Sequence, residues 1–298
     1  MTRPVGIDTD PGIDDALALL LAWGSPEIAV EALTVVAGNV TVELGTANAR
    51  RLLDLRRPDP TPTLAAGAPQ PLARPLVTAD HYHGRDGLGG LDDWPPVTAR
   101  PIAPAVQTLL DLTRRHGRAL SLIALGPLTN LALALEREPG ILARPGRVVV
   151  MGGAVDVPGN VTPEAEFNIH VDPEAAARVL ASGCTIDLVP LDATRQVMVE
   201  RAQMQAALAR RPGPLGTRVL AFTAHAFARE NARMTLHDPL AVGVAVDPTL
   251  VEWEPVRIEV DTGGRTRRAA GPSNCRVARR VDRARFLAMF LERLCPGS

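Results

Sequence analysis

The chain has 298 residues, a formal net charge of −1 and 46% hydrophobic residues. This is the composition of a globular protein, and the balanced charge gives no field that would attract nucleic acid or an anionic membrane. With only 3% aromatic residues, the chain has few platforms for stacking single-stranded nucleic acid. We therefore expect neither a nucleic-acid partner nor a membrane partner.

The basic and sulfur-containing side chains exclude further chemistries. All 32 basic residues are arginines, which excludes Schiff-base chemistry, a P-loop lysine and a lysine general base. The three cysteines, Cys184, Cys275 and Cys295, have no zinc-binding spacing and form no disulfide framework. The sequence also shows neither a signal-peptide core nor a membrane-length apolar run. These features predict a cytoplasmic protein.

Short apolar runs alternate with helical patterns along the chain. The predicted strands are Val5–Asp8, Ile28–Val36, Ser121–Leu125, Arg147–Met151 and Ile186–Leu191, and the predicted helices are Ala16–Trp23, Val42–Leu55, Leu128–Glu138 and Pro173–Ala181. This alternation predicts an α/β fold, a single domain over residues 1–298 with a Rossmann-like, mostly parallel central sheet and helices on both faces. Ligands of such sheets bind at the carboxyl ends of the strands.

Three segments interrupt or follow this alternation. Arg56–Pro75, which is rich in proline, and Val77–Arg100, which contains a glycine-rich stretch, are predicted to be surface loops. The C-terminal segment Pro255–Ser298 carries ten arginines against four acids. We expect it to form a hairpin and a helix with a solvated face rather than a nucleic-acid patch, because charge runs are usually solvated.

The most informative motif is DTDPGIDD at residues 8–15, where the first strand turns into a helix. It contains Asp8, Asp10, Asp14 and Asp15. Capping of the helix accounts for Asp14 and Asp15 but not for acids at the end of an apolar strand. Acids packed this closely repel one another unless protons or a cation neutralise them, and oxygen ligands suit calcium or magnesium. The motif therefore predicts a metal site.

Polar segments follow the later strands as well. Met151 begins a turn that leads to Asn160 and to the triplet Glu166-Phe167-Asn168, whose side chains either bind hydroxyl groups or make a polar turn.

Two further segments have a functional and a structural interpretation. His237 is of the side-chain type best suited to donate a proton near neutral pH, and Asp238 either caps the element that follows or contributes to a site. The carbonyl of Leu125 either ligates calcium or belongs to an ordinary strand-to-helix turn.

Together these segments resemble the inosine-uridine-preferring nucleoside hydrolase family. The matching stretches are DTDPGIDDALALLLA at 8–22, VAGNV at 36–40, HGRDGLGG at 83–90, LGPLTNLALAL at 125–135, MGGAV at 151–155, GNVTPEAEFNIHVDPEAA at 159–176 and HDPLAV at 237–242. The resemblance implies the nucleoside hydrolase fold and hydrolysis of the N-glycosidic bond of ribonucleosides to base and ribose. It also implies a calcium cofactor, a role in nucleoside salvage and a homo-oligomer, either a dimer or a tetramer.

The resemblance also implies a role for each matching residue. Asp10 would be a calcium ligand and the general base for the attacking water, and Asp15, Asp238 and the Leu125 carbonyl would be the other ligands. Asp8 would support the site. The residues expected to bind substrate are Asp14, Asn39, His81, His83, Met151, Asn160, Glu166, Phe167, Asn168 and His237. Within this set, His237 would protonate the leaving base. Of the two histidines on the loop that closes over the site, His83 is favoured over His81 as the one that faces the substrate.

The sequence departs from the family where the base should bind. Residues 221–236 contain no tyrosine, and Tyr82 is the only tyrosine of the chain. We expect a pyrimidine or mixed inosine and uridine preference, and the roles of His225 and Arg233 stay open. Two alternative functions remain. One is a haloacid-dehalogenase-type phosphatase, suggested by Asp8-Thr9-Asp10 but lacking the usual lysine, and the other is a non-catalytic ribose- or nucleoside-binding protein.

Overall fold

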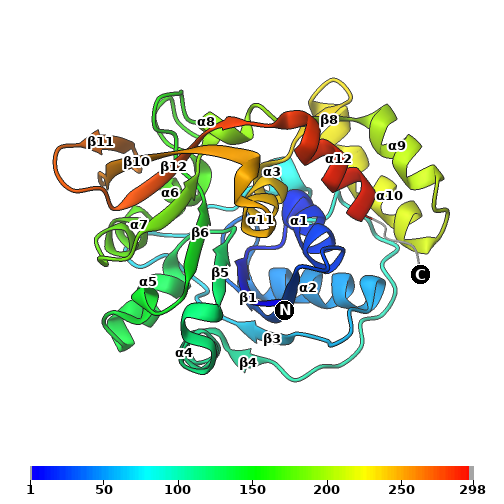
Figure 1. Ribbon diagram of the computed structural model, residues 1–298. Coiled ribbons are helices and arrows are strands. Elements are labelled where there is room, and N and C mark those ends of the chain that lie inside the picture. Colours follow the sequence, from blue (N-terminus) through cyan, green and yellow to red (C-terminus); the bar gives the residue numbers. More distant parts are fainter. Residues whose placement is uncertain (1, 295–298) are drawn as a thin grey trace.

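A ten-stranded sheet runs through the molecule (Figure 1). The computed structural model describes residues 2–294. The strand order is β11-β10-β12-β7-β6-β5-β1-β2-β3-β4. Within the described residues, the antiparallel pairings of this sheet are those of β10 with β11 and with β12, and the other neighbouring strands pair in parallel. The predicted α/β fold with a mostly parallel central sheet is confirmed.

The elements have the following bounds. The strands of the large sheet are β1 (Arg3–Thr9), β2 (Ile28–Val35), β3 (Thr63–Ala66), β4 (Ala103–Pro104), β5 (Ser121–Ala124), β6 (Arg147–Met151), β7 (Ile186–Val189), β10 (Val251–Val260), β11 (Thr266–Ala269) and β12 (Cys275–Val281), and β8 (Met198–Glu200) pairs with β9 (Arg233–Thr235) in a separate ribbon. The helices are α1 (Ile13–Trp23), α2 (Val42–Arg56), α3 (Asp80–His83), α4 (Ala105–His116), α5 (Thr129–Arg137), α6 (Phe167–Val171), α7 (Pro173–Leu180), α8 (Leu191–Thr194), α9 (Arg201–Ala209), α10 (Pro214–Arg229), α11 (His237–Val246) and α12 (Arg283–Arg293).

Three sequence-based predictions need correction. The expected loop Arg56–Pro75 contains β3, which pairs in parallel with β2, and its proline-rich flanks hid this short strand. The expected loop Val77–Arg100 contains the one-turn helix α3. The strand predicted over Ile186–Leu191 ends at Val189, because Pro190 follows and Leu191 already begins α8.

Both faces of the sheet are buried. In β5, Ile123 packs into a core with α1, α2, α10, α11 and α12, whereas its neighbours Leu122 and Ala124 pack into a second core with α4, α5 and α7. In β6, Val149 and Val150 divide between the same two cores. Since alternate residues of a strand point to opposite faces, helices cover the sheet on both sides.

The register aligns the carboxyl ends of the central strands. Asp8 of β1 lies beside Thr34 of β2 on one side and Ala124 of β5 on the other, and Ala124 lies beside Val150 of β6. Residues that follow these strands therefore meet at one edge of the sheet. The helix α11 packs on α1 and brings His237 and Asp238, distant in sequence, to the same edge (Figure 1).

The arginine-rich C-terminal segment is paired with acids. Arg268 and Arg279 both bind Asp156 and Glu254, and Arg285 binds Asp247. This pairing agrees with a solvated face formed by the β10–β11 hairpin, β12 and α12. None of the helices within residues 2–294 combines the length and apolar character that crossing a membrane needs. Cys184 and Cys275 are buried free thiols, and Cys295 lies outside the described residues.

A buried ion pair makes a testable contribution to stability. Asp187 on β7 has a side chain only 3% exposed and accepts hydrogen bonds at 2.7 Å from Arg147 and Arg276. Asp187→Ala would leave the buried Arg147 charge without its carboxylate, so we expect the free energy of unfolding in urea to fall by about 3–5 kcal/mol. The control is Glu136→Ala, which breaks an exposed pair with Arg178 and should cost less than about 1 kcal/mol. Equal losses would contradict this account.

Candidate active site

The turn between β1 and α1 is organised around Asp15. Its Oδ2 accepts the backbone N–H of Gly12 and the side-chain amide of Asn39, both at 3.0 Å, and its Oδ1 accepts the hydroxyl of Thr9 at 2.5 Å. Asp15 thus caps α1, whereas Asp14 does not occupy the N-cap position, which belongs to Gly12. The capping explanation accounts for one acid of the motif.

Asp10 is buried, and among residues 2–294 only one of its two carboxylate oxygens has a hydrogen-bond partner. Its Oδ2 accepts the backbone N–H of Asn39 at 2.7 Å, but its Oδ1 has no hydrogen-bond partner among residues 2–294. A Cβ atom at position 38 would lie 2.1 Å from Asp10 Oδ2, so the glycine of the VAGNV stretch is needed for this close approach. A buried carboxylate oxygen without a donor is the kind of group that a cation satisfies.

Carboxylates from both ends of the chain converge beside Asp10. Ligand oxygens of Asp14, Asp15 and Asp238 all lie within 4.8 Å of one another, and the three residues are buried. The structure therefore brings together two of the sequence-predicted metal ligands, Asp15 and Asp238. Asp14, which the resemblance assigned to ribose binding, belongs to the same group. This arrangement has the geometry to hold a metal ion.

The electrostatics of the cluster favour neutralisation. Burial raises the pKa of Asp14 to about 8, with a further contribution from the charge of Asp15. Burial also raises the pKa of Asp10 and of Asp238 well above the ordinary value, and neighbouring carboxylates raise each further. Without a cation, ionisation of the whole group is therefore unfavourable.

Asp8 is buried and does not line the cavity. Its Oδ1 accepts hydrogen bonds from Thr34 and, at 2.8 Å, from Asn130, while burial raises its pKa to about 7. Asn130 also accepts the backbone N–H of Ala68 at 2.9 Å. Asp8 therefore ties β1 to β2 and to the start of α5, a supporting position.

A cavity of about 260 Å³ opens above the carboxylates. Its walls contain twelve sequence-predicted site residues: Asp14, Asn39, His81, His83, Leu125, Met151, Asn160, Glu166, Phe167, Asn168, His237 and Asp238. Asp10 and Asp15 are fully buried and do not line the cavity. Ala79, Tyr82, Val161 and Glu230 also line the cavity and were not predicted. Tyr82 and Val161 are next to predicted residues in the sequence and Ala79 is two positions before His81, so their neighbourhood could have indicated them. No local motif marks Glu230.

The wall that follows β5 and β6 is polar and rigidly bonded. Glu166 is the N-cap of α6 and accepts the backbone N–H groups of Asn168, Ile169 and Gly153 at 2.9–3.1 Å. The amide of Asn168 donates to the carbonyls of Leu125 at 2.5 Å and Met151 at 3.2 Å. Asn160 accepts the backbone N–H of Phe167 at 2.9 Å. The loop that follows β5 and the loop that follows β6 are thus fixed around the same cavity.

The histidines of the cavity differ in exposure. His83 is buried, whereas His81 is exposed. His83 Nδ1 accepts the backbone N–H of Ile13 at 3.0 Å, and burial lowers its pKa to about 4. The ring is therefore neutral at pH 7 and carries its proton on Nε2. His237 Nδ1 contacts the hydroxyl of Thr194 at 2.8 Å, which leaves Nε2 for the cavity, and burial lowers the pKa of His237 to about 4.

The two residues whose roles were open lie outside the cavity wall. His225 is half-buried on α10, and its Nε2 has no hydrogen-bond partner among the described residues. Arg233 is exposed on β9 and lies 3.6 Å from Glu200. Neither contributes to the lining.

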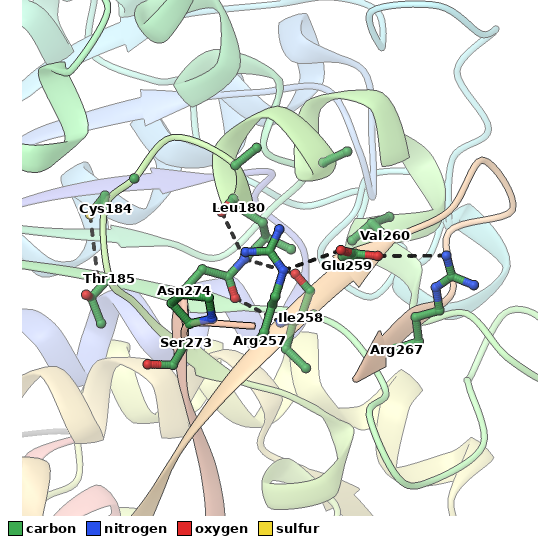
Figure 2. A pocket seen from close by; sticks show the side chains of 14 residues that line it. Leu180, Cys184, Thr185, Arg257, Ile258, Glu259, Val260, Arg267, Ser273 and Asn274 are labelled. Atoms are coloured by element: carbon green, nitrogen blue, oxygen red, sulfur yellow. Dashed lines mark hydrogen bonds and ion pairs between the residues drawn. The ribbon is translucent and has the colours of Figure 1, made fainter. Parts of the chain in front are cut away.

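A second cavity, of about 410 Å³, lies between α7 and the β10–β11 hairpin (Figure 2). Figure 2 shows that its charged groups pair with one another, since Glu259 binds both Arg257 and Arg267. The amide of Asn274 donates to the carbonyls of Leu180 and Ile258. Because these groups satisfy each other, the cavity above the carboxylates is the better candidate for chemistry.

Comparison with known proteins identifies the family. The family described as "Inosine-uridine preferring nucleoside hydrolase" matches residues 5–288. The chain belongs to this family. It is 35% identical to the inosine-uridine preferring nucleoside hydrolase of Leishmania major, over 99% of this chain and 98% of that protein. It is also 35% identical to the pyrimidine-specific ribonucleoside hydrolase RihA of Salmonella agona, over 99% of each.

Solved structures agree with this assignment. The structure of the plant nucleoside hydrolase PpNRh1 superposes with a TM-score of 0.91 at 34% identity and covers 100% of both chains. The nucleoside hydrolase fold and the membership expected from the motifs are confirmed. The chain is thus an N-glycosyl hydrolase, and this result favours the hydrolase interpretation over the phosphatase and the non-catalytic binding protein.

The raised pKa values predict how stability depends on pH when divalent ions are removed. Between pH 6.5 and pH 8, folded Asp14 still holds a proton that the unfolded chain has released, because its pKa is about 8 in the folded state and 3.8 ordinarily. The free energy of unfolding in chelator should therefore fall as pH rises through this range.

Urea unfolding in chelator at pH 6.5 and at pH 8 measures this fall in the free energy of unfolding. His83 and His237 contribute little to the change in the free energy of unfolding between pH 6.5 and pH 8. The pKa of each is about 4 in the folded chain and 6.5 ordinarily, at or below this range in both cases. Asp14→Asn should flatten the fall, and added calcium should reduce it. A free energy that rises from pH 6.5 to pH 8 in chelator would contradict the electrostatic account.

Proposed function

We propose that this protein hydrolyses pyrimidine ribonucleosides, or uridine and inosine alike, with calcium as its metal. The convergence of Asp14, Asp15 and Asp238 under a polar cavity is the observation on which the proposal rests. The ligands would be Asp10, Asp15, Asp238 and the carbonyl of Leu125. All four offer oxygen ligands, which suits a hard cation. The Oδ1 of Asp10, which has no hydrogen-bond partner in the described part of the chain, is a position that such an ion would satisfy.

The Leu125 carbonyl is compatible with this role. It already accepts a hydrogen bond from Asn168 at 2.5 Å, but a carbonyl oxygen has two lone pairs and can also coordinate an ion. Asn168 would then orient this ligand as well as contact the sugar.

Ribose would be held by the polar wall of the cavity. Asp14, Asn39, Asn160, Glu166 and Asn168 all line it, and carboxylate and amide groups bind vicinal hydroxyls as acceptors and donors. Met151 and Phe167 would pack against the sugar. The hydrogen bonds that fix Glu166 and Asn168 to the backbone would preorganise them for this purpose.

The reaction passes through a ribosyl cation that resembles an oxocarbenium ion. A bound calcium ion would supply a Lewis acid that lowers the pKa of its water and chelates the sugar diol. Asp10 would take the proton of the attacking water. The surrounding carboxylates would stabilise positive charge on the ribose, and direct attack by water would invert the anomeric carbon.

The base would leave on the side of His237. With Nδ1 held by Thr194, Nε2 is the atom available to the leaving base. The imidazole is neutral at pH 7 in the ligand-free protein, because burial lowers its pKa to about 4, so it would act through its N–H. His237 would donate this proton to the departing base. His83 would contact the base from the opposite loop through its Nε2 proton.

The base preference does not follow from overall similarity. The inosine-uridine and the pyrimidine-specific relative are equally similar to this chain, at 35% identity. The preference for pyrimidine or mixed substrates rests on His237 and on the lack of tyrosine over residues 221–236. We also propose that the protein is a homo-oligomer, is located in the cytoplasm and acts in nucleoside salvage.

Release of ribose from uridine, cytidine, inosine and adenosine tests the function. We expect turnover of uridine, with or without inosine, in calcium. Chelation should abolish turnover and calcium should restore it, because the metal activates the water. Equal turnover in chelator would contradict the metal assignment, and bound nucleoside without ribose release would support a binding protein instead.

Substitution of His237 tests acid catalysis. His237→Ala should slow hydrolysis of uridine by about 10²–10⁴-fold, the usual contribution of a positioned acid or base. The same substitution should slow hydrolysis of nitrophenyl riboside much less, because the leaving group of this substrate needs no proton. The ratio of kcat values for the two substrates is the readout, and equal losses would argue against proton donation by His237.

A further inference from the structure

Glu230 lines the cavity but belongs to none of the family-like motifs. It follows directly after α10, and its two carboxylate oxygens bind different segments. Oε1 accepts the hydroxyl of Tyr82, and Oε2 accepts the backbone N–H of Thr235 at 3.3 Å. One side chain therefore connects the loop around α3 with the end of β9.

Each of these segments carries a histidine of the cavity. Tyr82 stands between His81 and His83, and its ring meets the ring of His83 edge-on, with centroids 4.9 Å apart and planes at 73°. Thr235 is two residues before His237. The chain of contacts from His83 through Tyr82 and Glu230 to Thr235 thus links the two walls that would contact the base.

The loop after α3 is fixed independently at its other end. The carboxylate of Asp86 accepts the backbone N–H groups of Leu88 and Leu91 and the indole N–H of Trp94. Gly89 has φ +84°, and a Cβ there would lie 2.5 Å from the carbonyl of Phe222 in α10. The Tyr82–Glu230 contact consequently holds the end of the loop that faces the cavity.

The phenol of Tyr82 remains a donor under ordinary conditions. Burial, together with the charges of Asp14 and Glu230, raises its pKa well above the ordinary value. Its partner is a carboxylate, and hydrogen bonds to charged groups are stronger than those between neutral groups. The contact is therefore suited to fixing a loop.

We propose that Glu230 and Tyr82 are a pair of positioning residues that fix the base-side wall of the cavity and so set the affinity for the nucleobase part of the substrate. The inference rests on the proposed function, since it assumes that the base lies between His83 and His237. It assigns neither residue a step in bond cleavage. The predicted signature is weaker nucleoside binding with little change in the chemical step.

Kinetics with uridine test the pair. Tyr82→Phe removes one hydroxyl and should raise KM roughly 10-fold, while kcat changes less than threefold. Glu230→Ala should raise KM at least as much, and the double variant should be no worse than Glu230→Ala alone because both substitutions break the same contact. Glu230→Gln, which keeps an acceptor for the phenol, should recover most of the affinity.

A matched control lies on the neighbouring ribbon. Glu200→Gln alters the exposed pair with Arg233 across β8 and β9 and should leave KM unchanged. Unchanged KM in Tyr82→Phe, or independent, additive effects of Tyr82→Phe and Glu230→Ala, would overturn the proposal.

The single tyrosine of the chain provides a readout that does not depend on catalysis. Incorporated 3-fluorotyrosine gives one fluorine resonance, which Glu230→Ala should shift and Glu200→Gln should not. A resonance unmoved by Glu230→Ala would overturn the contact itself.

The same resonance separates this inference from the proposed function. If the wild-type protein releases no ribose, the proposed function fails, and titration of the resonance with uridine still compares nucleoside affinities. Weaker uridine binding in Glu230→Ala than in wild type supports the pair, and equal dissociation constants overturn it.

Discussion

Repulsion among buried carboxylates is the constraint on which the rest of this structure depends. Asp10, Asp14, Asp15 and Asp238 are buried from water and close enough to raise one another's pKa, and Asp14 and Asp238 line the cavity. Such a group is unfavourable when fully ionised unless a cation neutralises it. A fold that nevertheless brings these acids together from both ends of the chain has the charge and geometry of a binding site for a divalent ion.

The parallel sheet makes this convergence possible. β1, β2, β5 and β6 end in register, so the segments after them share one edge. Helix α11 contributes Asp238 from a distant part of the sequence because it packs on α1 through the same core. The polar loops after β5 and β6 line the same cavity as His83 and His237. The carboxylates are thus brought together by ordinary α/β packing, and the segment around α3 and Glu230 complete the lining of the cavity.

Local signals in the sequence were sufficient to predict the strands β1, β2, β5, β6 and β7 and the acidic turn, whereas most of the cavity wall was predicted through the family resemblance. Asp15 shows why the alternatives were hard to separate, because it both caps α1 and belongs to the carboxylate cluster. β3 was missed because it has four residues between proline-rich flanks and gains its stability from pairing with β2. Glu230 was missed because its role depends on contacts with Tyr82 and Thr235, which no spacing rule encodes.

Calcium titration of the metal-free protein by calorimetry tests the central claim most directly. Wild type should bind one calcium ion per chain at the carboxylate cluster. Asp238→Asn should abolish or greatly weaken this binding although residue 238 lies more than two hundred residues from Asp10 and Asp15 in the sequence. Calcium affinity that is unchanged in Asp238→Asn, or no calcium binding by wild type, would contradict the account.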